Sequence, residues 1–600
     1  MMAALVACSS GSSSSTGGGG GGTTPISVAL TGAPATLPAN GTASITATVS
    51  NDSAAKGVTW SCTPASSCGS FNPTATASGS ATVYTAPGAA GSVVVTATSV
   101  TDTTKTASAT IDVTVATITL ADGNYVYALS GFDANENPYT LDGVFTVASG
   151  AITAGEQDFV DDTNGDLHDA INPTGSGYTT TTDGNLQLTL VTCAGSTCTA
   201  VDTAIGPGGN GMETINGSMV SSTRFRLIGY DSFATSSGTL DAQNATAAAT
   251  TPAGPYIFTA GGYEGIAGGG ILNFSGATVS TTGTVVDLNQ AGTIELGQTI
   301  SVGSVQAPDA SGRLLVQVTL TDANTTVINL VGYIVDASRV QIEAATVPIG
   351  GTAYAQNTAS LGVSGNSYVY GALGQDGIGP FQSAGVLTMG SSGTVTGAIS
   401  TNDLANFQVP SAAITAGTYV ADTTNVGRYT LTGVTNGVTT FNIQLYVDGN
   451  GNALVLTADT TDELAGPAFQ QTASATMSGT YVMNDTGADV TNEFELDAVG
   501  PVTTGTGTFS GFADLNWLNT GTSGTQTPDL TVTGAFTAPS GGVSTGTGNT
   551  ITGLDVTTKT NADAFDYYVV DSTRVIAINV EGTATVLPTQ LDLIFFEVTQ

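Results

Sequence analysis

The fold is decided by the stretch FDYYVVDSTRV, residues 565–575. Aromatic and β-branched residues fill its first half, a composition typical of a β-strand. Asp571 and Ser572 then favour a turn, and the chain returns to apolar residues at Val575, directly after Arg574. The stretch therefore predicts a strand, a tight turn, and a second strand that begins beside an arginine.

Similar turns occur earlier in the chain, as Ser222-Thr223-Arg224-Phe225 and Ser338-Arg339-Val340. The arginines are separated by 115 and 235 residues, and the second interval is about twice the first. In the gap, 447–452 (VDGNGN) has the same strand-turn character and places Asn452 where an arginine is expected. Alternating Asn and Gly there is what a tight hairpin requires. These four positions indicate an internal repeat. We name them the landmark residues: Arg224, Arg339, Asn452 and Arg574.

A second feature repeats with nearly the same period. Tyrosines that open an apolar run lie at Tyr125, Tyr256, Tyr368 and Tyr481, at intervals of 131, 112 and 113 residues. Two features in the same order predict homologous antiparallel β modules, which must hide their strand edges by closing into small barrels or, alternatively, by pairing as sandwiches. The predicted modules are 117–248, 249–360, 361–475 and 476–600. We expect the four tyrosines to share a place on first strands, and Arg224, Arg339, Asn452 and Arg574 to share one on a late strand.

Composition agrees with an all-β chain. Its 600 residues include 79 glycines and only 9% charged residues, which disfavours amphipathic helices. The formal net charge of −37 excludes DNA and RNA as partners, because phosphates would be repelled. It also repels anionic lipid headgroups, so any membrane attachment is expected to be covalent.

Residues 25–116 read as a separate domain. Short alternating segments such as ASITATVS (43–50), GVTWSC (57–62) and SVVVTATS (92–99) follow one another between turns, as in a β-sandwich. With Trp60 as the core tryptophan, this region resembles bacterial Ig-like domains of the group 2 kind. The resemblance implies an Ig-like sandwich that precedes the repeated modules.

The N-terminus indicates a lipid anchor. Leu5-Val6-Ala7-Cys8 resembles the lipobox of bacterial lipoproteins, which implies that 1–8 is the end of a truncated signal peptide and that Cys8 carries the lipid. The basic and most of the apolar part of a signal peptide are missing, so we expect the true start to lie upstream. The Ser/Gly tract 9–24 then acts as a flexible linker. The alternative is a free thiol in a disordered tail. Ser9 after the cysteine favours the outer membrane or cell surface.

The remaining cysteines form two local pairs, Cys62 with Cys68 and Cys193 with Cys198. Neither pair has CxxC spacing and the chain has one histidine, which argues against zinc. We expect two disulfides that each stiffen a turn in an oxidising compartment.

Motifs for catalysis or metal binding are weak. His168 is the one possible proton acceptor for a serine nucleophile, and we interpret it as a solvated loop residue. Asp162, Asn164 and Asp166 mimic the start of a calcium loop, but Leu167 stands where that loop needs glycine. The alternative, an acidic hairpin whose Asx residues satisfy the turn backbone, is preferred. No cofactor is expected.

The recurring arginines allow two interpretations. In the first, each is a structural residue that pairs with a carboxylate or carbonyl of its own module; in the second, each marks an anion or sugar site. The structural interpretation is preferred, because the module with Asn452 has lost the arginine without losing its pattern.

Together these features predict a lipid-anchored, non-enzymatic protein of the bacterial cell surface. Its modules would bind a polysaccharide or another surface protein, with weak sites strengthened by repetition. The alternatives are a purely structural stalk or spacer and, less favoured, a carbohydrate-active enzyme whose two carboxylates no spacing identifies.

Overall fold

A computed structural model describes most of the chain. The described residues are 24–39, 41–65, 68–163, 165–193, 198, 201, 210–262, 265–290, 292–377, 379–403, 409–472, 476–489, 494–519, 524–546, 548–554, 562–580 and 590–600. The chain divides into two compact units, Met1–Val115 (unit 1) and Ala116–Gln600 (unit 2). Strands make up nearly all regular structure in both, so the predicted all-β fold class is confirmed.

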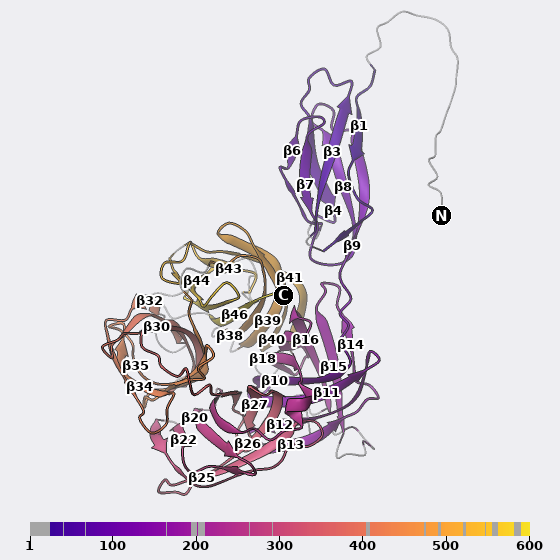
Figure 1. Ribbon diagram of the computed structural model, residues 1–600. Coiled ribbons are helices and arrows are strands. Elements are labelled where there is room, and N and C mark those ends of the chain that lie inside the picture. The colour runs from indigo at the N-terminus through magenta and orange to yellow at the C-terminus, as the bar shows by residue number, and fades with distance from the viewer. Residues whose placement is uncertain are drawn as a thin grey trace, which may run out of the picture. The chain divides into compact units, whose positions relative to one another are not determined.

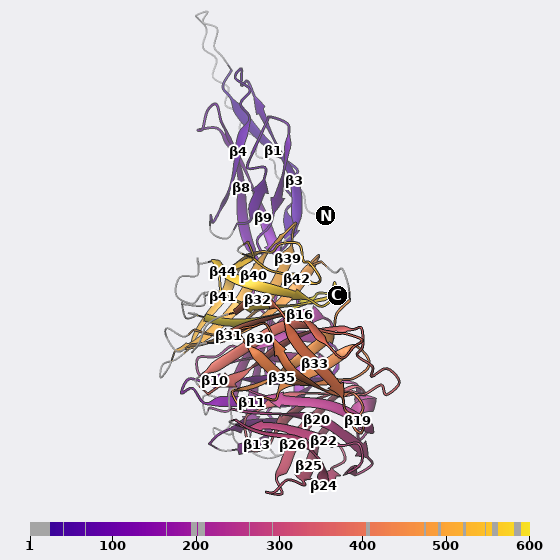
Figure 2. The same cartoon turned by 90° about the vertical axis from the view of Figure 1, so that its left-hand side faces the viewer.

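Unit 1 consists of two sheets that share one hydrophobic core (Figures 1 and 2). In its described part, strands β1, β3, β7 and β5 form one sheet, and β2, β9, β8, β4 and β6 form the other. Trp60 is buried in this core and donates through Nε1 to Thr76 Oγ1 at 3.1 Å. The strands are β1 (Ser27–Thr31), β2 (Thr36–Pro38), β3 (Thr42–Ser50), β4 (Val58–Thr63), β5 (Ser70–Asn72), β6 (Ala75–Thr76), β7 (Ala81–Thr85), β8 (Gly91–Ser99) and β9 (Thr106–Thr114).

The described strands of unit 2 group into four antiparallel sheets, named barrels 1 to 4. Barrel 1 comprises β10 (Gly123–Asp133), β11 (Pro138–Ala148), β12 (Ala151–Asp161), β13 (Gly165–Ile171), β14 (Gly177–Thr180), β15 (Leu186–Cys193), β16 (Met212–Ser221), β17 (Arg224–Gly229) and β18 (Ala234–Ala242). Barrel 2 follows the short helix α1 (Ala245–Ala248) and comprises β19 (Gly254–Gly261), β20 (Ile266–Ser275), β21 (Thr278–Val279), β22 (Val285–Gln290), β23 (Thr293–Gln298), β24 (Ile300–Val305), β25 (Arg313–Leu320), β26 (Val327–Asp336), β27 (Arg339–Ala344) and β28 (Gly350–Ala355).

Barrels 3 and 4 repeat the arrangement. Barrel 3 comprises β29 (Ser367–Asp376), β30 (Pro380–Met389), β31 (Val395–Asp403), β32 (Val409–Ala413), β33 (Ala416–Ala421), β34 (Arg428–Thr435), β35 (Thr440–Val447), β36 (Asn452–Thr457) and β37 (Asp462–Gln470). Barrel 4 comprises β38 (Thr480–Asp489), β39 (Phe494–Thr504), β40 (Thr508–Asn519), β41 (Thr525–Ala535), β42 (Val543–Ser544), β43 (Thr550–Thr552), β44 (Ala562–Val569), β45 (Arg574–Asn579) and β46 (Gln590–Val598).

Each sheet closes on itself, which decides between barrel and sandwich. Most strands pair with their neighbours in sequence, and the first strand of each sheet pairs with the last, as β10 does with β18. The ring of strands is completed by β13–β15 in barrel 1, β19–β20 in barrel 2 and β44–β45 in barrel 4. In barrel 3 the closing contact is an isolated bridge between Thr394 and Thr418. Closure of this kind leaves few unpaired edges.

The barrel interiors are filled by side chains. Alternate residues of each first strand point inward, and the repeated tyrosines Tyr125, Tyr256, Tyr368 and Tyr481 all belong to these four cores. Each tyrosine lies two or three residues into β10, β19, β29 or β38, so their predicted equivalence is confirmed.

The residue after each tyrosine points outward and is buried between barrels. Val126 packs with Tyr333 of barrel 2, Ile257 with Tyr446 of barrel 3, Val369 with Tyr568 of barrel 4, and Val482 with Ile228 of barrel 1. Each first strand is therefore buried on both faces, and the four clusters join the barrels in a closed ring, 1 to 2 to 3 to 4 to 1. In Figure 1 the labels β10, β18, β38 and β46 lie toward the middle of unit 2.

Within the described residues, none of the helices combines the length and the apolar character needed to cross a membrane.

Candidate functional site

The four landmark residues occupy one equivalent position. Arg224, Arg339, Asn452 and Arg574 are the first residues of β17, β27, β36 and β45, each the penultimate strand of its barrel. The turn before each strand is held by a side-chain oxygen, from Ser221, Asp336, Asp448 or Asp571, that accepts a backbone N–H two residues further on. The predicted equivalence of the late-strand residues is confirmed.

The two repeated features are physically connected. The hydroxyl of Tyr256 donates to the carbonyl of Ala337 at 2.9 Å, and the hydroxyl of Tyr481 donates to the carbonyl of Ser572 at 2.9 Å. Both carbonyls belong to residues two positions before the landmark arginine. In barrels 2 and 4 the first-strand tyrosine therefore anchors the turn that places the arginine.

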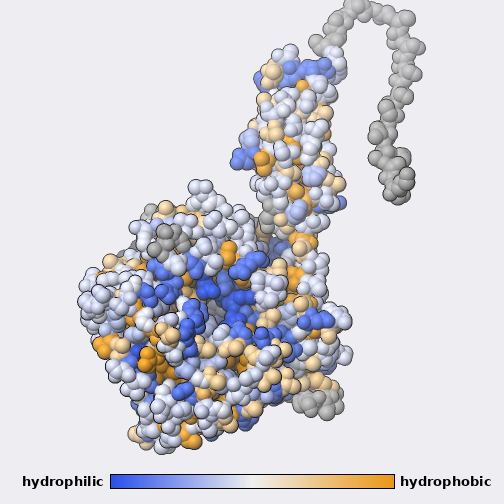
Figure 3. All heavy atoms as spheres, in the orientation of Figure 1, coloured by the Kyte–Doolittle hydropathy of each residue, from blue (hydrophilic) through white to orange (hydrophobic). Residues whose placement is uncertain are grey.

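All four landmark residues line one cavity at the centre of the ring of barrels. This central cavity has a volume of about 430 Å³. It is also lined by the residues that pair with the landmarks across the closing strands: Asp241, Tyr354, Phe469 and Glu597. Figure 3 shows hydrophilic residues gathered around a hollow in the middle of this unit. One position in each barrel thus builds a single shared site.

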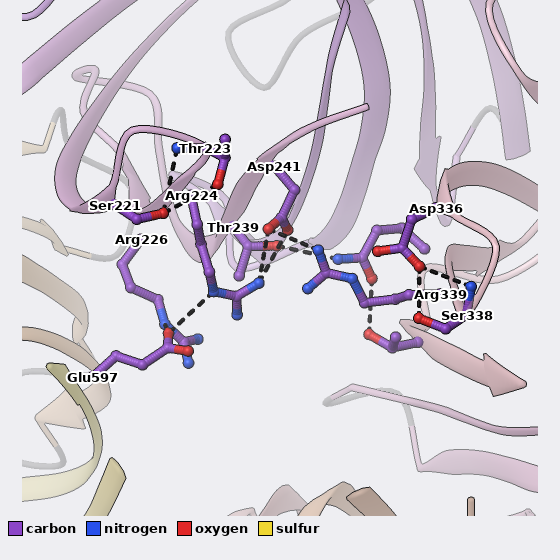
Figure 4. A network of polar contacts seen from close by, with 12 residues as sticks. Ser221, Thr223, Arg224, Arg226, Thr239, Asp241, Asp336, Ser338, Arg339 and Glu597 are labelled. Carbon is purple, nitrogen blue, oxygen red and sulfur yellow. Dashed lines mark hydrogen bonds and ion pairs between the residues drawn. The ribbon is translucent and has the colours of Figure 1, made fainter. Parts of the chain in front are cut away.

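Two carboxylates bind the arginines together across barrel boundaries (Figure 4). Asp241 accepts from Arg224 Nη1 at 2.8 Å and lies 2.7 Å from Nη2 of Arg339. Glu597 accepts from Nε of Arg226 at 2.8 Å and from Nε of Arg224 at 3.2 Å. The expectation that each arginine pairs within its own module is therefore wrong for Arg339, and Arg224 binds barrel 4 as well as its own. The reason is that these residues of all four barrels line the same cavity, so a carboxylate of one barrel lies within reach of an arginine of another.

The arginines change the acidity of their partners and of one another. Burial raises the pKa of Glu597, but the charges of Arg226, Arg224 and Arg574 outweigh it and hold that pKa well below its usual range. Burial lowers the pKa of Arg226, and the charges of Arg224 and Arg574 lower it further against the attraction of Glu597. Burial also lowers the pKa of Arg224, but the charges of Asp241 and Glu597 outweigh it and raise that pKa above its usual value.

Among the arginines that line the cavity, Arg574 makes the longest ion pair. Its Nη2 lies 3.6 Å from Glu597, its guanidinium lies over the Phe469 ring with Cζ 4.2 Å from the centroid, and its buried Nε has no hydrogen-bond partner. A buried donor without an acceptor is costly, and such groups often mark the place of a water or ligand.

Small residues keep a second, inner cavity open beside the first. It has a volume of about 250 Å³ and shares Arg224, Arg339 and Tyr354 with the central cavity. Gly238, Gly351 and Gly466 line it, and a Cβ on them would lie 1.8, 1.9 and 2.1 Å from a first-strand carbonyl oxygen. These glycines are required by the close approach of the last strand to the first.

Two further arginines sit between barrels in matching constellations. Arg313 contacts Asp158 of barrel 1 through two nitrogens, at 2.5 and 2.6 Å, and Tyr333 donates to the same carboxylate. Arg428 contacts Asp287 of barrel 2 at 2.6 and 2.7 Å, and Tyr446 donates to that carboxylate at 2.6 Å. Arg313 pairs across strands with Tyr333, as Arg428 does with Tyr446. The matched geometry indicates a structural role at the interfaces.

Of the predicted anchor and calcium-loop residues, the structure describes Asp162 and Asp166. Cys8 and Asn164 lie outside the described residues. Asp162 is exposed, whereas Asp166 lies on β13 with Oδ2 3.9 Å from Arg313 Nη2. Burial, and then the charge of Asp158, raise the pKa of Asp166 to about 7. In the part of the chain that the structure describes, no group of three or more His, Cys, Asp or Glu residues is arranged to hold a metal.

His168 was expected in a loop and instead lies on strand β13. Its Nε2 is 3.3 Å from Glu156 Oε2, and its side chain is 42% exposed. It is placed there by antiparallel pairing with β12, in which Asp158 lies opposite His168.

The cysteine pairs lie at disulfide distance, as predicted. The α-carbons of Cys62 and Cys68 are 5.7 Å apart, and those of Cys193 and Cys198 are 4.9 Å apart. Two disulfides are typical of an extracellular or periplasmic protein.

No known protein family model matches the chain, and no curated protein matches it.

Proposed function

We propose that this chain is a lipid-anchored protein of the bacterial cell surface with a non-catalytic binding or adhesion role. Cys8 carries the anchor, 9–24 is the tether, and the ring of barrels presents the binding site. A polysaccharide is the preferred ligand, and another surface protein is the alternative.

The observation that carries the proposal is the convergence of four equivalent positions on one cavity. In their described parts the interiors of the four barrels are filled by apolar side chains. The central cavity combines guanidinium groups, hydroxyl groups and the rings of Tyr354 and Phe469, and its volume of about 430 Å³ falls in the usual range for ligand sites. Sites that recognise sugars typically combine a few polar groups with an aromatic surface.

A structural stalk is the second candidate, and one observation favours it. Among the described residues, Phe233 is the one aromatic side chain that is largely exposed, at 43%. Within the described residues the outer surface therefore has no broad aromatic platform, and the proposed binding function rests on the central cavity.

A glycoside hydrolase is less well supported by the same cavity. Its general acid needs a raised pKa, whereas the pKa of Glu597 is lowered by three arginines. Asp241 is held between Arg224 and Arg339. These two carboxylates are engaged in ion pairs and are poorly suited to proton transfer, and the third, Asp336, accepts from the backbone N–H and the hydroxyl of Ser338.

The experiment that tests this function is a glycan array probed with the full chain, followed by an assay for new reducing ends on each polysaccharide bound. We expect binding to at least one acidic polysaccharide without release of reducing ends. Release of reducing ends would establish an enzyme, and failure to bind any glycan would favour the stalk.

The anchor has a separate test. Cells that express the full gene and receive a clickable fatty acid should label the protein, and Cys8→Ser should abolish the label. Label retained by Cys8→Ser would contradict lipidation at this residue.

A further inference from the structure

One position recurs at the four junctions between neighbouring barrels. It lies on β12, β22, β31 or β40 and faces the next barrel of the ring. Through the strand between them, it is aligned with the residue three positions after the repeated tyrosine. The residues at this position are Asp158, Asp287, Ser400 and Asp514. Three of the four junctions therefore contain a carboxyl group at the same place.

The partner of this carboxyl group in the next barrel is equivalent as well. Arg313, Arg428 and Asn185 each follow a turn in which their carbonyl accepts from the backbone N–H of the residue that opens the turn, Asp309, Asp422 or Thr181. The two arginines bind the carboxylates of the junctions between barrels 1 and 2 and between barrels 2 and 3. In the junction between barrels 4 and 1, Asn185 takes the place of the arginine, and Asp514 faces an uncharged amide.

The Asp514 carboxyl is buried and only partly satisfied. Its Oδ2 accepts from Nδ2 of Asn185 at 3.1 Å and from Nδ2 of Asn216 at 2.9 Å, whereas its Oδ1 is buried without a hydrogen-bond partner. The same Asn185 amide donates to Oδ2 of the buried Asp183 at 2.7 Å. One uncharged amide thus bridges two buried carboxyl groups that belong to different barrels.

The titratable groups around Asp514 in the described part of the junction add no positive charge. They are Asp183, Tyr230 and Asp231 of barrel 1 and Glu495, Asp497 and Asp529 of barrel 4. No ion pair between described residues joins any of them to a Lys or Arg. Beside the central cavity the same junction is held by Arg224 and Arg226, which bind Glu597. The acids without a cation lie in the part of the junction that does not line this cavity.

The surroundings of Asp514 favour its neutral form. Burial, followed by the charge of Asp183, raises the pKa of Asp514 to about 7, against the hydrogen bonds from the two amides. Burial and the charge of Asp183 also raise the pKa of Asp529. A bound proton removes the negative charge of Asp514, as the guanidinium compensates the carboxylate in the two junctions that contain an arginine.

We propose that the junction between barrels 4 and 1 is a pH-sensitive latch, formed by Asp183, Asn185, Asn216 and Asp514. A proton on Asp514 replaces the arginine of the other junctions, and loss of this proton loosens the junction on the side away from the central cavity. Deprotonation places a buried negative charge beside Asp183 on the same amide, and separation of the two barrels at this point returns that charge to water.

The direction of the effect follows from the state that holds the proton more tightly. In the open junction Asp514 is solvated and loses its proton near pH 4, whereas in the closed junction it keeps the proton up to a pKa of about 7. Opening therefore becomes about tenfold more favourable for each pH unit between about 4 and 7, and the effect levels off above pH 7. The latch is tightest in acid.

A backbone hydrogen bond across the junction reports its opening. The N–H of Gly524 in barrel 4 donates to the carbonyl of Ser232 in barrel 1 at 2.7 Å. Amide hydrogen exchange of the full chain, corrected for the intrinsic rate at each pH, gives the protection factor of this N–H. We expect the protection factor to fall about tenfold per pH unit from about pH 5 to pH 7. A constant protection factor over this range would overturn the proposal.

Two variants assign the effect to the latch. Asp514→Asn keeps an acceptor for the two amides but does not titrate, and Asn185→Arg supplies the arginine of the other junctions. Each should make the protection of Gly524 independent of pH, so one of them is sufficient if the other does not fold. Asp162→Asn, which removes an exposed acid of barrel 1, is the control and should keep the pH dependence. The natural pH dependence in either latch variant would refute the role of Asp514.

A divalent cation is the alternative occupant of the place beside Asp514. Calcium chloride added to the natural chain at about pH 8 should leave the protection of Gly524 unchanged, because the latch responds to protons. An increase in protection that Asp514→Asn abolishes would place a metal ion at this carboxylate in place of the proton, and the proposal would fail.

Discussion

Arg339 of barrel 2 makes its closest ion pair, at 2.7 Å, with Asp241 of barrel 1. The same carboxylate accepts from Arg224, which also reaches Glu597 of barrel 4. Three barrels are therefore linked by one continuous chain of charges on the ring axis. The arginines act together, so the structural and functional interpretations of these residues apply to one site and not to four.

The ion pairs between barrels should be important for stability. Arg428→Gln leaves Asp287, which is fully buried, without its cation, and should destabilise the chain by about 3 to 5 kcal/mol. Urea unfolding of the full chain measures this as a lower midpoint. Lys105→Gln should change stability by less than about 0.5 kcal/mol. The double replacement of Arg428 by Met and Asp287 by Leu should recover most of the loss, and equal midpoints for Arg428→Gln and the natural chain would refute the interface role.

Buried acids between barrels 1 and 2 should make stability fall as pH rises. Burial, followed by the charges of Asp142 and Asp158, raises the pKa of Glu343 well above its usual range. Below about pH 4 the folded and unfolded states are both protonated. At higher pH the unfolded state loses the proton and the folded state keeps it, at a cost of up to about 1.4 kcal/mol per pH unit.

Glu343→Gln should therefore raise the melting temperature at pH 8 and change it little at pH 4. Differential scanning calorimetry across this range is the measurement, with the exposed Asp162→Asn as control. A variant that is less stable than the natural chain at pH 8 would show that Glu343 is ionised and paired in the folded state.

His168 gives a direct reading of one electrostatic contact. Its hydrogen bond with Glu156 raises its pKa, and burial opposes this. Because the chain has one histidine, its imidazole signal in an NMR titration is unambiguous. We expect a midpoint above the usual value of about 6.5, which Glu156→Gln should lower. The contact favours folding below pH 6.5, and this contribution is lost as pH rises through the folded pKa. A midpoint at or below 6.5 would show that burial dominates.

Much of the fold follows from the sequence because strand and turn chemistry is local. The spacing of Tyr125, Tyr256, Tyr368 and Tyr481 predicts equivalent first strands, and that prediction is confirmed. Barrel closure could be favoured but not decided, since it depends on whether the strands at the two ends of a sheet meet.

The shared centre could not be predicted, because it depends on how the barrels pack against one another. One signal was available: Tyr333, Tyr446 and Tyr568 each lie six residues before a landmark residue, and all three prove to be buried between barrels. Asp241 and Glu597 carry no such local signal. Their importance arises only from cross-strand pairing with Arg224 and Arg574.

The central claim is that the four barrels form a closed ring, and the contact between the last barrel and the first tests it. Ser237 of β18 and Thr486 of β38 meet through their hydroxyl groups, although 249 residues separate them. The double variant Ser237→Cys, Thr486→Cys should form a disulfide under mild oxidation, seen as a reducible band of altered mobility and as a linked peptide in mass spectrometry. The pair Ser237→Cys, Thr388→Cys, which joins barrel 1 to barrel 3, should not form one. Efficient linkage of the first pair alone is the predicted result, whereas no linkage, or equal linkage of both pairs, would contradict the ring.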